Sequence, residues 1–426
     1  MGDPTSNANQ SLRFLHCADL HIDSPLRGLE AYEGAPVERL RSATRESFEN
    51  LITLAVRERV AFVVIAGDLF DGKWQDIQTG LWTAAQFRRL EREEIPVYLL
   101  RGNHDAASEV RQRVRWPDNV REFSVEQPET IIDAKTGFAL HGQGFTTREV
   151  LEDLAANYPD PVPDTLNIGV LHTSLTGDPN HDSYAATTED VLKLRGYDYW
   201  ALGHVHNRRT VHDDPTIIFP GNTQGRHIHE RGAKGCVLVS VSDGHISRVD
   251  FEATDTLRWH QAIVEMVLDD QIEQLYVSVS NKLHQCREES DGRFAAVRLW
   301  IRGACRCHSD LMTQSIREEV VTEIRNMANS ISDVWVEKIK FDTSAPVDVE
   351  ALRSGNDLMG DLLALIDEFA AGDNEQLLEL SEHLKPLQDK AQGDLLQAGI
   401  DLSDPETIRR WLGDSERLLV GMIRDE

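Results

Sequence analysis

The amino-acid sequence predicts an α/β fold built on a largely parallel sheet. Five short apolar runs have the length and composition of strands that are buried on both faces. Segments with apolar residues at helical spacing separate the first three runs, and this order favours parallel strands with right-handed connections. Each run stops at residues of metal-binding types. Because the carboxyl ends of parallel strands meet at one edge of a sheet, these residues are expected to gather there.

The predicted elements follow one another along the chain. The five buried strands are residues 14–18, 62–65, 97–101, 166–171 and 199–202. The two crossover helices are residues 39–59 and 76–94. A turn signal at Lys135-Thr136-Gly137 predicts a hairpin between residues 130 and 142. Residues 216–219 and 235–241 have the composition of further strands.

Composition divides the 426 residues into four parts. Residues 1–11 are polar and are expected to be disordered, and residues 12–258 hold the five strands. Residues 259–345 show a strand–helix–strand–helix–strand order, which predicts a small separate α+β domain. Residues 346–426 are acidic and show helical spacing, so they are expected to form a helical arm.

Charge and composition exclude several classes of protein. The 72 acidic residues outnumber the 44 basic ones, and the formal net charge is -28. This argues against a protein that coats nucleic acid non-specifically, because such affinity comes largely from Lys and Arg. Five scattered cysteines give no disulfide framework and no paired zinc spacing. No apolar run approaches the roughly 20 residues of a membrane span, so we expect a cytoplasmic protein without a membrane partner.

The polar residues at the strand ends have the chemistry of a metal centre. They are Asp19, His21, Asp68, Asn103, His104, His172, His204 and His206. An isolated Gly-Asp pair after a strand is more often a helix N-cap, but five such ends in order are hard to explain without a metal. Carboxylate, carboxamide and imidazole ligands without thiolate favour manganese, iron or zinc. About seven ligands with one shared carboxylate suffice for two ions, which can activate water for attack at phosphorus.

Five sequence blocks resemble those of a known superfamily. They are FLHCADLHIDSPLRGL, IAGDLFDG, LLRGNHD, YDYWALGHVHNR and FPGNTQGRHIHE, and they are similar to the calcineurin-like metallophosphoesterases over about residues 11–250. Within that superfamily they resemble the YhaO-like bacterial DNA repair exonucleases, relatives of the SbcD nuclease subunit. The resemblance implies a four-layer αββα sandwich with a two-metal site. We therefore expect this sandwich at 12–258, a small α+β cap domain at 259–345 and a helical C-terminal arm.

Carried over position by position, the resemblance implies two sets of metal ligands that share one carboxylate. Asp19, His21, Asp68 and His206 would bind one ion, and Asp68, Asn103, His172 and His204 would bind the other. The expected cofactor is a pair of divalent ions, with manganese favoured and iron or zinc as alternatives.

The resemblance also implies a proton donor. His104 would stabilise or protonate the leaving oxygen, a role that suits the near-neutral pKa of histidine. Either Asp105 or Asp71 would orient it. Archaeal and eukaryotic relatives often carry a second histidine at the position of Asp71, and the aspartate of this chain matches the SbcD-like pattern.

Other polar residues admit two interpretations. The basic residues Arg111, Arg113, Arg115 and Arg121 form either a solvated face or the wall of a groove that contacts a nucleic-acid backbone. One hypothesis places Arg226, His227 and His229 at the site, because they follow a Pro-Gly-Asn turn. His141 is interpreted as structural, and His181 as a surface histidine.

The acidic arm holds three apolar stripes at helical spacing. They comprise Leu358, Leu362, Leu363, Leu365, Ile366 and Phe369; Leu377, Leu378, Leu380 and Leu384; and Ile408, Trp411, Leu412, Leu418, Leu419 and Met422. The stripes either pack onto the protein's own domains or dock on a partner. The resemblance favours a large coiled-coil ATPase as that partner, because related nucleases dock C-terminal helices onto such an ATPase. A homodimer is also left open.

Together these observations predict a metal-dependent phosphodiesterase that hydrolyses DNA, with a DNA repair exonuclease as the expected type. Two alternatives stay open. One is a small-molecule phosphodiesterase or phosphatase on the same scaffold, because a fold does not fix its substrate. The other is a non-catalytic regulatory subunit, which has no chemical need for an intact ligand set.

Overall fold

The computed structural model describes residues 12–24, 34–72, 76–106, 114–175, 185–346, 352–353, 358–383, 385–386 and 404–422. Its contacts form two compact units. The first runs up to Ala262 and includes Ser280–Leu299 and Arg325–Ile339. The second comprises Ile263–Val279, Trp300–Ile324 and the chain from Lys340 onward. Each unit is described by itself below.

The first unit contains two six-stranded sheets. The order in the first sheet is β12 (His245–Ala253), β11 (Gly235–Ser242), β1 (Leu12–Cys17), β2 (Val63–Ala66), β3 (Val97–Leu100) and β4 (Val120–Glu122). The four strands from β1 to β4 are parallel, and β11 and β12 are antiparallel additions. The predicted crossover helices are α1 (Val37–Arg57) and α2 (Ile77–Arg92).

The second sheet has the order β5 (Glu129–Ile132), β6 (Ala139–Gly142), β7 (Asn167–His172), β8 (Tyr199–Gly203), β10 (Thr216–Phe219) and β9 (Arg209–His212). Strands β6, β7, β8 and β10 are parallel, whereas β5 and β9 pair antiparallel at the two edges. A 3-10 turn η2 (Ala155–Asn157) and the helix α4 (Glu189–Leu194) belong to the connections of this sheet.

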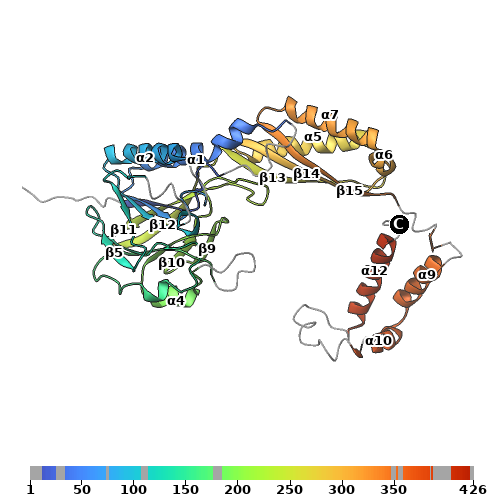
Figure 1. Ribbon diagram of the computed structural model, residues 1–426. Helices are drawn as coiled ribbons and strands as arrows, with labels where there is room; N and C mark the ends of the chain where they lie inside the picture. The colour runs from blue at the N-terminus through green and yellow to red at the C-terminus, as the bar shows by residue number, and fades with distance from the viewer. Residues whose placement is uncertain are drawn as a thin grey trace, which may run out of the picture. The chain divides into compact units, whose positions relative to one another are not determined.

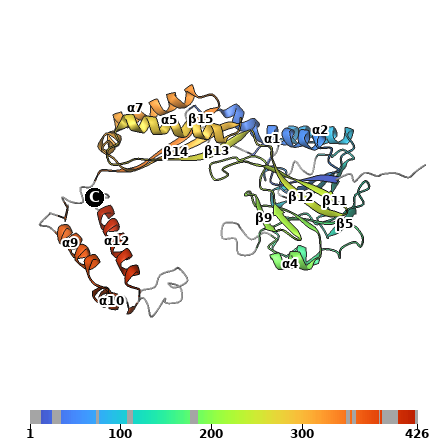
Figure 2. The same cartoon turned by 180° about the vertical axis from the view of Figure 1, so that it is seen from behind.

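Three apolar clusters hold four layers together. The cluster between the sheets contains Phe14 and Val64 of the first sheet and Ile168 of the second. A second cluster packs α1 and α2 on the outer face of the first sheet, and a third packs the η2 and α4 region on the outer face of the second. Figures 1 and 2 show α1 and α2 beyond one sheet and α4 beyond the other. The expected αββα sandwich is therefore confirmed.

Period-two alternation explains why these strands are apolar throughout. Phe14 of β1 lies in the cluster between the sheets, and its neighbour Leu15 lies in the cluster under the helices. Val64 and Val63 of β2 divide in the same way. Successive side chains of a strand point to opposite faces, and both faces are covered here. A polar residue inside such a strand needs a buried hydrogen-bond partner, as His16 has in the Tyr199 hydroxyl, whereas a polar residue at the strand end does not.

The chain after β12 forms a three-stranded sheet in the order β13 (Leu257–Glu265), β14 (Phe294–Ala304) and β15 (Val334–Ser344). Helix α5 (Ile272–Glu289) connects the first two strands, and α6 (His308–Met312) and α7 (Gln314–Ser330) connect the last two. This is the strand and helix order that the sequence predicts for residues 259–345. The domain boundaries themselves stay a prediction.

Three C-terminal helices pack against one another in the second unit. They are α9 (Leu358–Ala371), α10 (Asn374–Glu382) and α12 (Pro405–Met422). Leu377 and Ile408 are buried between them with Trp411 and Leu412 alongside. Leu384 lies outside the described residues, as do the side chains of Leu418, Leu419 and Met422. Among the described helices, none is long and apolar enough to cross a membrane.

The structure corrects the sequence-based elements in small ways. His172 is the last residue of β7 and does not follow the strand. Strands β4 and β9 and the helix α4 were not predicted. β4 has three residues and α4 has six, and such short elements show no measurable period.

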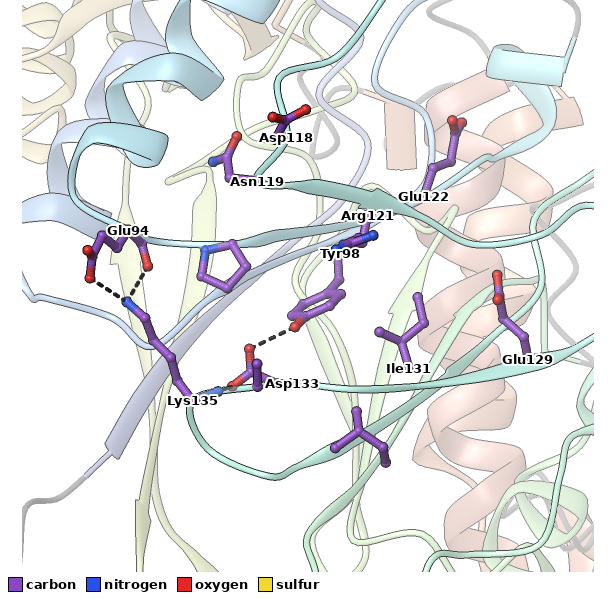
Figure 3. Close-up of a pocket in the computed structure, with 13 residues that line it drawn as sticks. Glu94, Tyr98, Asp118, Asn119, Arg121, Glu122, Glu129, Ile131, Asp133 and Lys135 are labelled. Atoms are coloured by element: carbon purple, nitrogen blue, oxygen red, sulfur yellow. Dashed lines mark hydrogen bonds and ion pairs between the residues drawn. The ribbon is translucent and has the colours of Figure 1, made fainter.

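A pocket of about 510 Å³ opens beside β3, β4 and β5, on the side where β3 begins. In Figure 3 the Tyr98 hydroxyl points to Asp133, to which it donates a hydrogen bond of 2.7 Å. The ammonium group of Lys135 lies 3.6 Å from the Glu94 carboxylate. This pocket shares no lining residue with the polar set at the carboxyl ends of the strands.

Candidate metal centre

Both sheets deliver the predicted ligands to one place. Asp19 and His21 follow β1, Asp68 follows β2, and Asn103 begins the short helix α3 (Asn103–Ala106) after β3. The second sheet supplies His172 at the end of β7 and both His204 and His206 after β8. The backbone N–H of His204 donates to the Asp19 carboxylate at 3.0 Å, which ties the two sheet edges together. All seven predicted ligands therefore lie where the carboxyl ends of strands from the two sheets meet.

Local backbone geometry turns these residues into the site. Asp19, His21, Asp68 and His204 have left-handed φ angles of 52°, 43°, 55° and 99°. Aspartate and histidine adopt this region more readily than bulky or β-branched residues, but it is still uncommon. These four residues lie within a few positions after β1, β2 and β8, where the strands end.

Two glycines allow the close approach of the ligands. A Cβ at Gly67, whose φ is +98°, would lie 2.3 Å from Nδ1 of His172. A Cβ at Gly102 would lie 2.2 Å from Oδ1 of Asp68. Any side chain at these positions would displace a candidate ligand, so the sequence requires glycine there.

The ligand atoms lie within reach of common ions. Three groups have ligand atoms that all lie within 4.8 Å of one another: Asp19, His21 and His206; Asp19, Asp68 and His172; and His21, Asp71 and His104. Oδ2 of Asp68 is central, at 3.7 Å from Nε2 of His21 and 3.5 Å from Nε2 of His172. This position suits a carboxylate that two ions share.

Hydrogen bonding leaves acceptor atoms facing one another. Nδ1 of His172 lies 3.0 Å from the carbonyl oxygen of Ala66, which can only accept, so Nδ1 carries the proton. Nε2 of His172 is then an acceptor, and it lies 2.8 Å from Oδ1 of Asn103, which is also an acceptor. Two acceptors repel each other at this distance, and a cation that both atoms ligate removes the repulsion.

Electrostatics point the same way. Burial, together with the charge of Asp68, raises the pKa of Asp19 well above its usual value, and burial raises the pKa of Asp68 as well. Burial lowers the pKa of His172 to about 3 and also lowers the pKa of His21. The imidazoles are therefore neutral, as metal ligands must be, and the paired carboxylates need a cation to stay ionised. The residues fit divalent metal ions.

His104 forms an ion pair beside the centre. Its Nδ1 lies 2.7 Å from Oδ1 of Asp71, and its backbone N–H donates to Oδ1 of Asp68 at 2.9 Å. Burial opposes protonation, but the hydrogen bond to Asp71 and the charge of Asp68 raise the pKa of His104. Burial alone would raise the pKa of Asp71, but the hydrogen bond and charge of His104 lower it to about 2. Ser24 also donates to Asp71 at 2.9 Å.

Asp105 contacts the backbone instead of His104. Its carboxylate accepts the N–H groups of Leu69 and Phe70 at 3.1 and 3.0 Å, and that of Gly102 at 3.2 Å. Burial and the charge of Asp68 raise its pKa to about 7. Asp105 therefore holds together the loops after β2 and β3. Of the two aspartates suggested by the sequence, Asp71 is the one that contacts His104.

Sequence reasoning missed one buried acid. Oε1 of Glu230, whose side chain is 5% exposed, lies 2.7 Å from Nδ1 of His206. Burial would raise the pKa of Glu230, but the hydrogen bond from His206 and the charge of Arg226 hold it well below its usual range. Arg226 lies at the centre as hypothesised, whereas His227 and His229 are exposed. Glu230 ends the last of the five sequence blocks, but no spacing within that block indicates its contact with His206.

The remaining polar predictions have mixed outcomes. Arg115 and Arg121 are exposed, while Arg111 and Arg113 lie outside the described residues, as does His181. His141 is buried between Thr130 and Asn167, to which its two ring nitrogens are hydrogen bonded at 2.9 and 3.0 Å. It is the third of the four residues of β6 and belongs to none of the three groups of candidate ligands.

The geometry agrees with comparisons to known proteins. Residues 12–208 match the calcineurin-like phosphoesterase family, and residues 259–344 match the middle domain of metallophosphoesterase YhaO. The chain is 37% identical over 296 residues to an uncharacterized metallophosphoesterase YhaO of Bacillus subtilis (strain 168), covering 68% of this chain and 72% of that protein. It is 21% identical over 406 residues to a DNA double-strand break repair protein Mre11 of Sulfolobus acidocaldarius, covering 89% of this chain and 100% of that one.

Solved structures resemble the chain more distantly. A dimetal phosphatase from Danio rerio covers 57% of this chain and 99% of its own at 13% identity, with a TM-score of 0.34. That score is too low to support any inference about this chain. The family match and the YhaO relative carry the assignment, and calcineurin-like phosphoesterases use a dinuclear metal site, for which this chain has candidate ligand clusters. The chain belongs to the calcineurin-like metallophosphoesterases, in the branch that contains YhaO.

Proposed function

We propose that the protein is a phosphodiesterase that hydrolyses DNA, with exonuclease activity. The observation that carries the proposal is the convergence of ligand-type side chains from the ends of two sheets, beside the His104–Asp71 ion pair. Two of the similar proteins are called DNA double-strand break repair protein Mre11, which supports DNA as the substrate.

Two groups of side chains would hold two divalent ions. As the resemblance implies, Asp19, His21, Asp68 and His206 would hold one ion, and Asp68, Asn103, His172 and His204 would hold the other. Manganese is the proposed metal, because oxygen and imidazole ligands suit it. The bound ions would activate water and neutralise the charge that develops on the phosphoryl oxygens.

His104 is the proposed proton donor to the leaving oxygen. Nδ1 donates to the Asp71 carboxylate, so Nε2 is the nitrogen left to give a proton. The ion pair with Asp71 favours the protonated imidazole, which is the form that a general acid requires. With 29% of its side chain exposed, His104 is also accessible to substrate.

DNA contact is proposed to be local, because the formal net charge of -28 opposes general attraction of a polyanion. The exposed Arg115 and Arg121, together with Arg111 and Arg113, are the proposed contacts to the phosphate backbone. Replacing Arg115 and Arg121 with Gln should raise KM for long DNA and leave hydrolysis of a small ester unchanged. An equal loss on both substrates would assign these arginines to the fold.

The test uses the manganese-loaded full chain with end-labelled single- and double-stranded DNA and with bis-p-nitrophenyl phosphate. We expect cleavage of all phosphodiesters by the wild type and of none by Asp68→Asn. Hydrolysis of the small ester without any cleavage of DNA would instead support a small-molecule phosphodiesterase, an alternative that the acidity of the chain favours. Absence of both activities from a metal-loaded protein would refute the proposal.

The C-terminal helices are proposed to bind a partner ATPase with coiled coils. Leu358, Leu365 and Leu378 are 75%, 46% and 39% exposed although the helices already pack on one another. Replacing the three leucines with Asp should abolish co-purification with the cognate ATPase while metal content stays the same. Retained co-purification would place the partner surface elsewhere. Because β15 continues to Ser344, a truncation should be made after Pro346 to leave that strand whole.

A further inference from the structure

The buried carboxylate of Glu230 contacts the ring of the candidate ligand His206, on the side of the ring that faces away from the centre. Oε1 of Glu230 lies 2.7 Å from Nδ1 of His206. Nε2 of the same ring lies 3.2 Å from Nε2 of His21 and 3.9 Å from Oδ1 of Asp19. The imidazole of His206 therefore stands between the candidate ligands and Glu230.

The contacts define which nitrogen of His206 carries the proton. Nη2 of Arg226 also lies 3.3 Å from Nδ1, and taken alone it would require Nδ1 to accept. Yet the same Nη2 donates to Oε1 of Glu230 at 2.9 Å, and a carboxylate can only accept. The shorter contact, from Nδ1 to the carboxylate, therefore decides the tautomer. The proton lies on Nδ1, and the lone pair of Nε2 faces the centre.

Other donors fix Glu230 in turn. Nδ2 of Asn222 donates to Oε2 at 3.0 Å, and the backbone N–H of Arg226 donates to the same oxygen at 2.7 Å. Nζ of Lys234 donates to the carbonyl oxygen of His206 at 2.8 Å, which holds the backbone of that ligand. Both oxygens of Glu230 are thus engaged, and the carboxylate has little freedom to turn away from His206.

His206 needs this support more than His21 and His172 do. Its side chain is 27% exposed, whereas those of His21 and His172 are 1% and 0% exposed. Packing fixes the buried rings, and His172 also donates to the Ala66 carbonyl. A ring at the exposed rim is free to rotate unless a hydrogen bond holds it. A carboxylate partner also makes the ligating nitrogen more basic than a carbonyl partner does.

We propose that Glu230 is a positioning residue: its carboxylate fixes the tautomer and orientation of His206 and thereby sets the affinity of the centre for its divalent ions. The inference rests on the proposed role of His206 as a metal ligand. It does not depend on the substrate.

The test compares Glu230→Gln and Glu230→Ala in the full chain. Glutamine keeps one acceptor oxygen for His206, but it loses the charge and presents an amide N–H₂ to the donors of Arg226 and Asn222. Loss of an outer partner typically weakens metal binding by about 10- to 100-fold. We expect the lower end for Glu230→Gln and the upper end for Glu230→Ala, measured as manganese and zinc content after dialysis against graded chelator.

A matched control is the buried pair of Glu337 and Arg298, which also lies in the first unit. Nε and Nη2 of Arg298 donate to the Glu337 carboxylate at 2.8 and 2.6 Å, and the glutamate side chain is 0% exposed. Glu337→Gln makes the same chemical change away from the centre. It should lower thermal stability to a similar degree and leave metal affinity unchanged. Equal metal affinity of Glu230→Gln and Glu337→Gln would overturn the proposal.

A second measurement is made on the wild type, and a variant serves only to assign the signals. Long-range ¹H–¹⁵N spectra of the zinc-loaded wild type, with His206 assigned from His206→Gln, report the protonated ring nitrogen. A proton on Nε2 would overturn the proposal, and a proton on Nδ1 supports it. Neither measurement uses DNA. If the wild type binds metal and cleaves no DNA, the proposed substrate fails while the role of Glu230 is still decided by metal affinity.

Discussion

Replacing Asp68 with Asn tests the whole centre, because one carboxylate serves both candidate groups. Asn keeps an Oδ1 to accept the His104 backbone N–H, which now bonds Asp68 at 2.9 Å. It also tolerates the φ of 55° at this position. The fold should therefore survive. The change removes the charge that lies 3.7 Å from His21 and 3.5 Å from His172.

Two opposite effects on stability follow. Without metal, Asp68 and Asp19 are buried carboxylates that repel each other, so the variant should melt at the same temperature as the wild type or higher. With metal at 100 times Kd, the wild type gains about 2.7 kcal/mol. The first unit has roughly 300 residues, so that is about 4 °C in Tm. If the variant binds about 100-fold more weakly, it gains only about 0.4 kcal/mol, or less than about 1 °C.

The assay is thermal unfolding of both proteins in EDTA and in manganese, followed by circular dichroism, with metal content measured in parallel. We expect the order of the two melting temperatures to depend on the metal. In EDTA the variant should melt at the same temperature as the wild type or higher. In manganese it should melt at a lower temperature than the wild type. An equal manganese-dependent rise in Tm for both proteins would refute the assignment of Asp68 as the shared ligand.

Three further outcomes are expected. His104→Ala should keep both metals and lose about 10² to 10⁴-fold in rate on DNA, with a smaller loss on nitrophenyl esters, whose leaving group needs no proton; equal losses would exclude a proton donor. Gly102→Ala should remove the metal-dependent rise in Tm, because its Cβ would lie 2.2 Å from the shared carboxylate of Asp68; an unchanged rise would show that the loop yields. Burial lowers the pKa of His16 to about 3, so its neutral form stabilises the fold above pH 6.5 and that stability is lost as the pH falls toward 3. At pH 5 the loss is about 2 kcal/mol, and His16→Gln should remove this part of the difference in unfolding free energy between pH 7 and pH 5.

The strand ends were predictable because parallel strands buried on both faces read as runs of mostly apolar residues that stop at polar ones. Asp68 and His172 lie 104 residues apart, yet each stands where a run of apolar residues stops. The residue pattern predicts that each lies at the carboxyl end of its strand, but it does not show that the two strands belong to different sheets whose ends meet at the centre. The turn signal at residues 135–137 likewise predicted the hairpin of β5 and β6, because its two strands are neighbours in sequence.

Contacts between loops were not predictable in the same way. Asp71 and Asp105 both follow strands at similar distances, and only the path of the chain after β3 decides that Asp105 turns back to the N–H groups of Leu69 and Phe70. Glu230 lies in a loop after β10 and meets His206 through side chains that a period cannot place. The pairing of β6 with β7 is non-local as well, and no pattern within either strand specifies it.

The left-handed backbone at Asp19, His21, Asp68 and His204 sets the placement of the candidate ligands against the stability of the fold. A non-glycine residue held there costs on the order of 1–3 kcal/mol. Glycine adopts this region without the steric cost, so a glycine at one of these positions should relieve the strain and remove a candidate ligand at the same time. The metal-free fold therefore carries strain at the four positions, and binding of a cation would offset it.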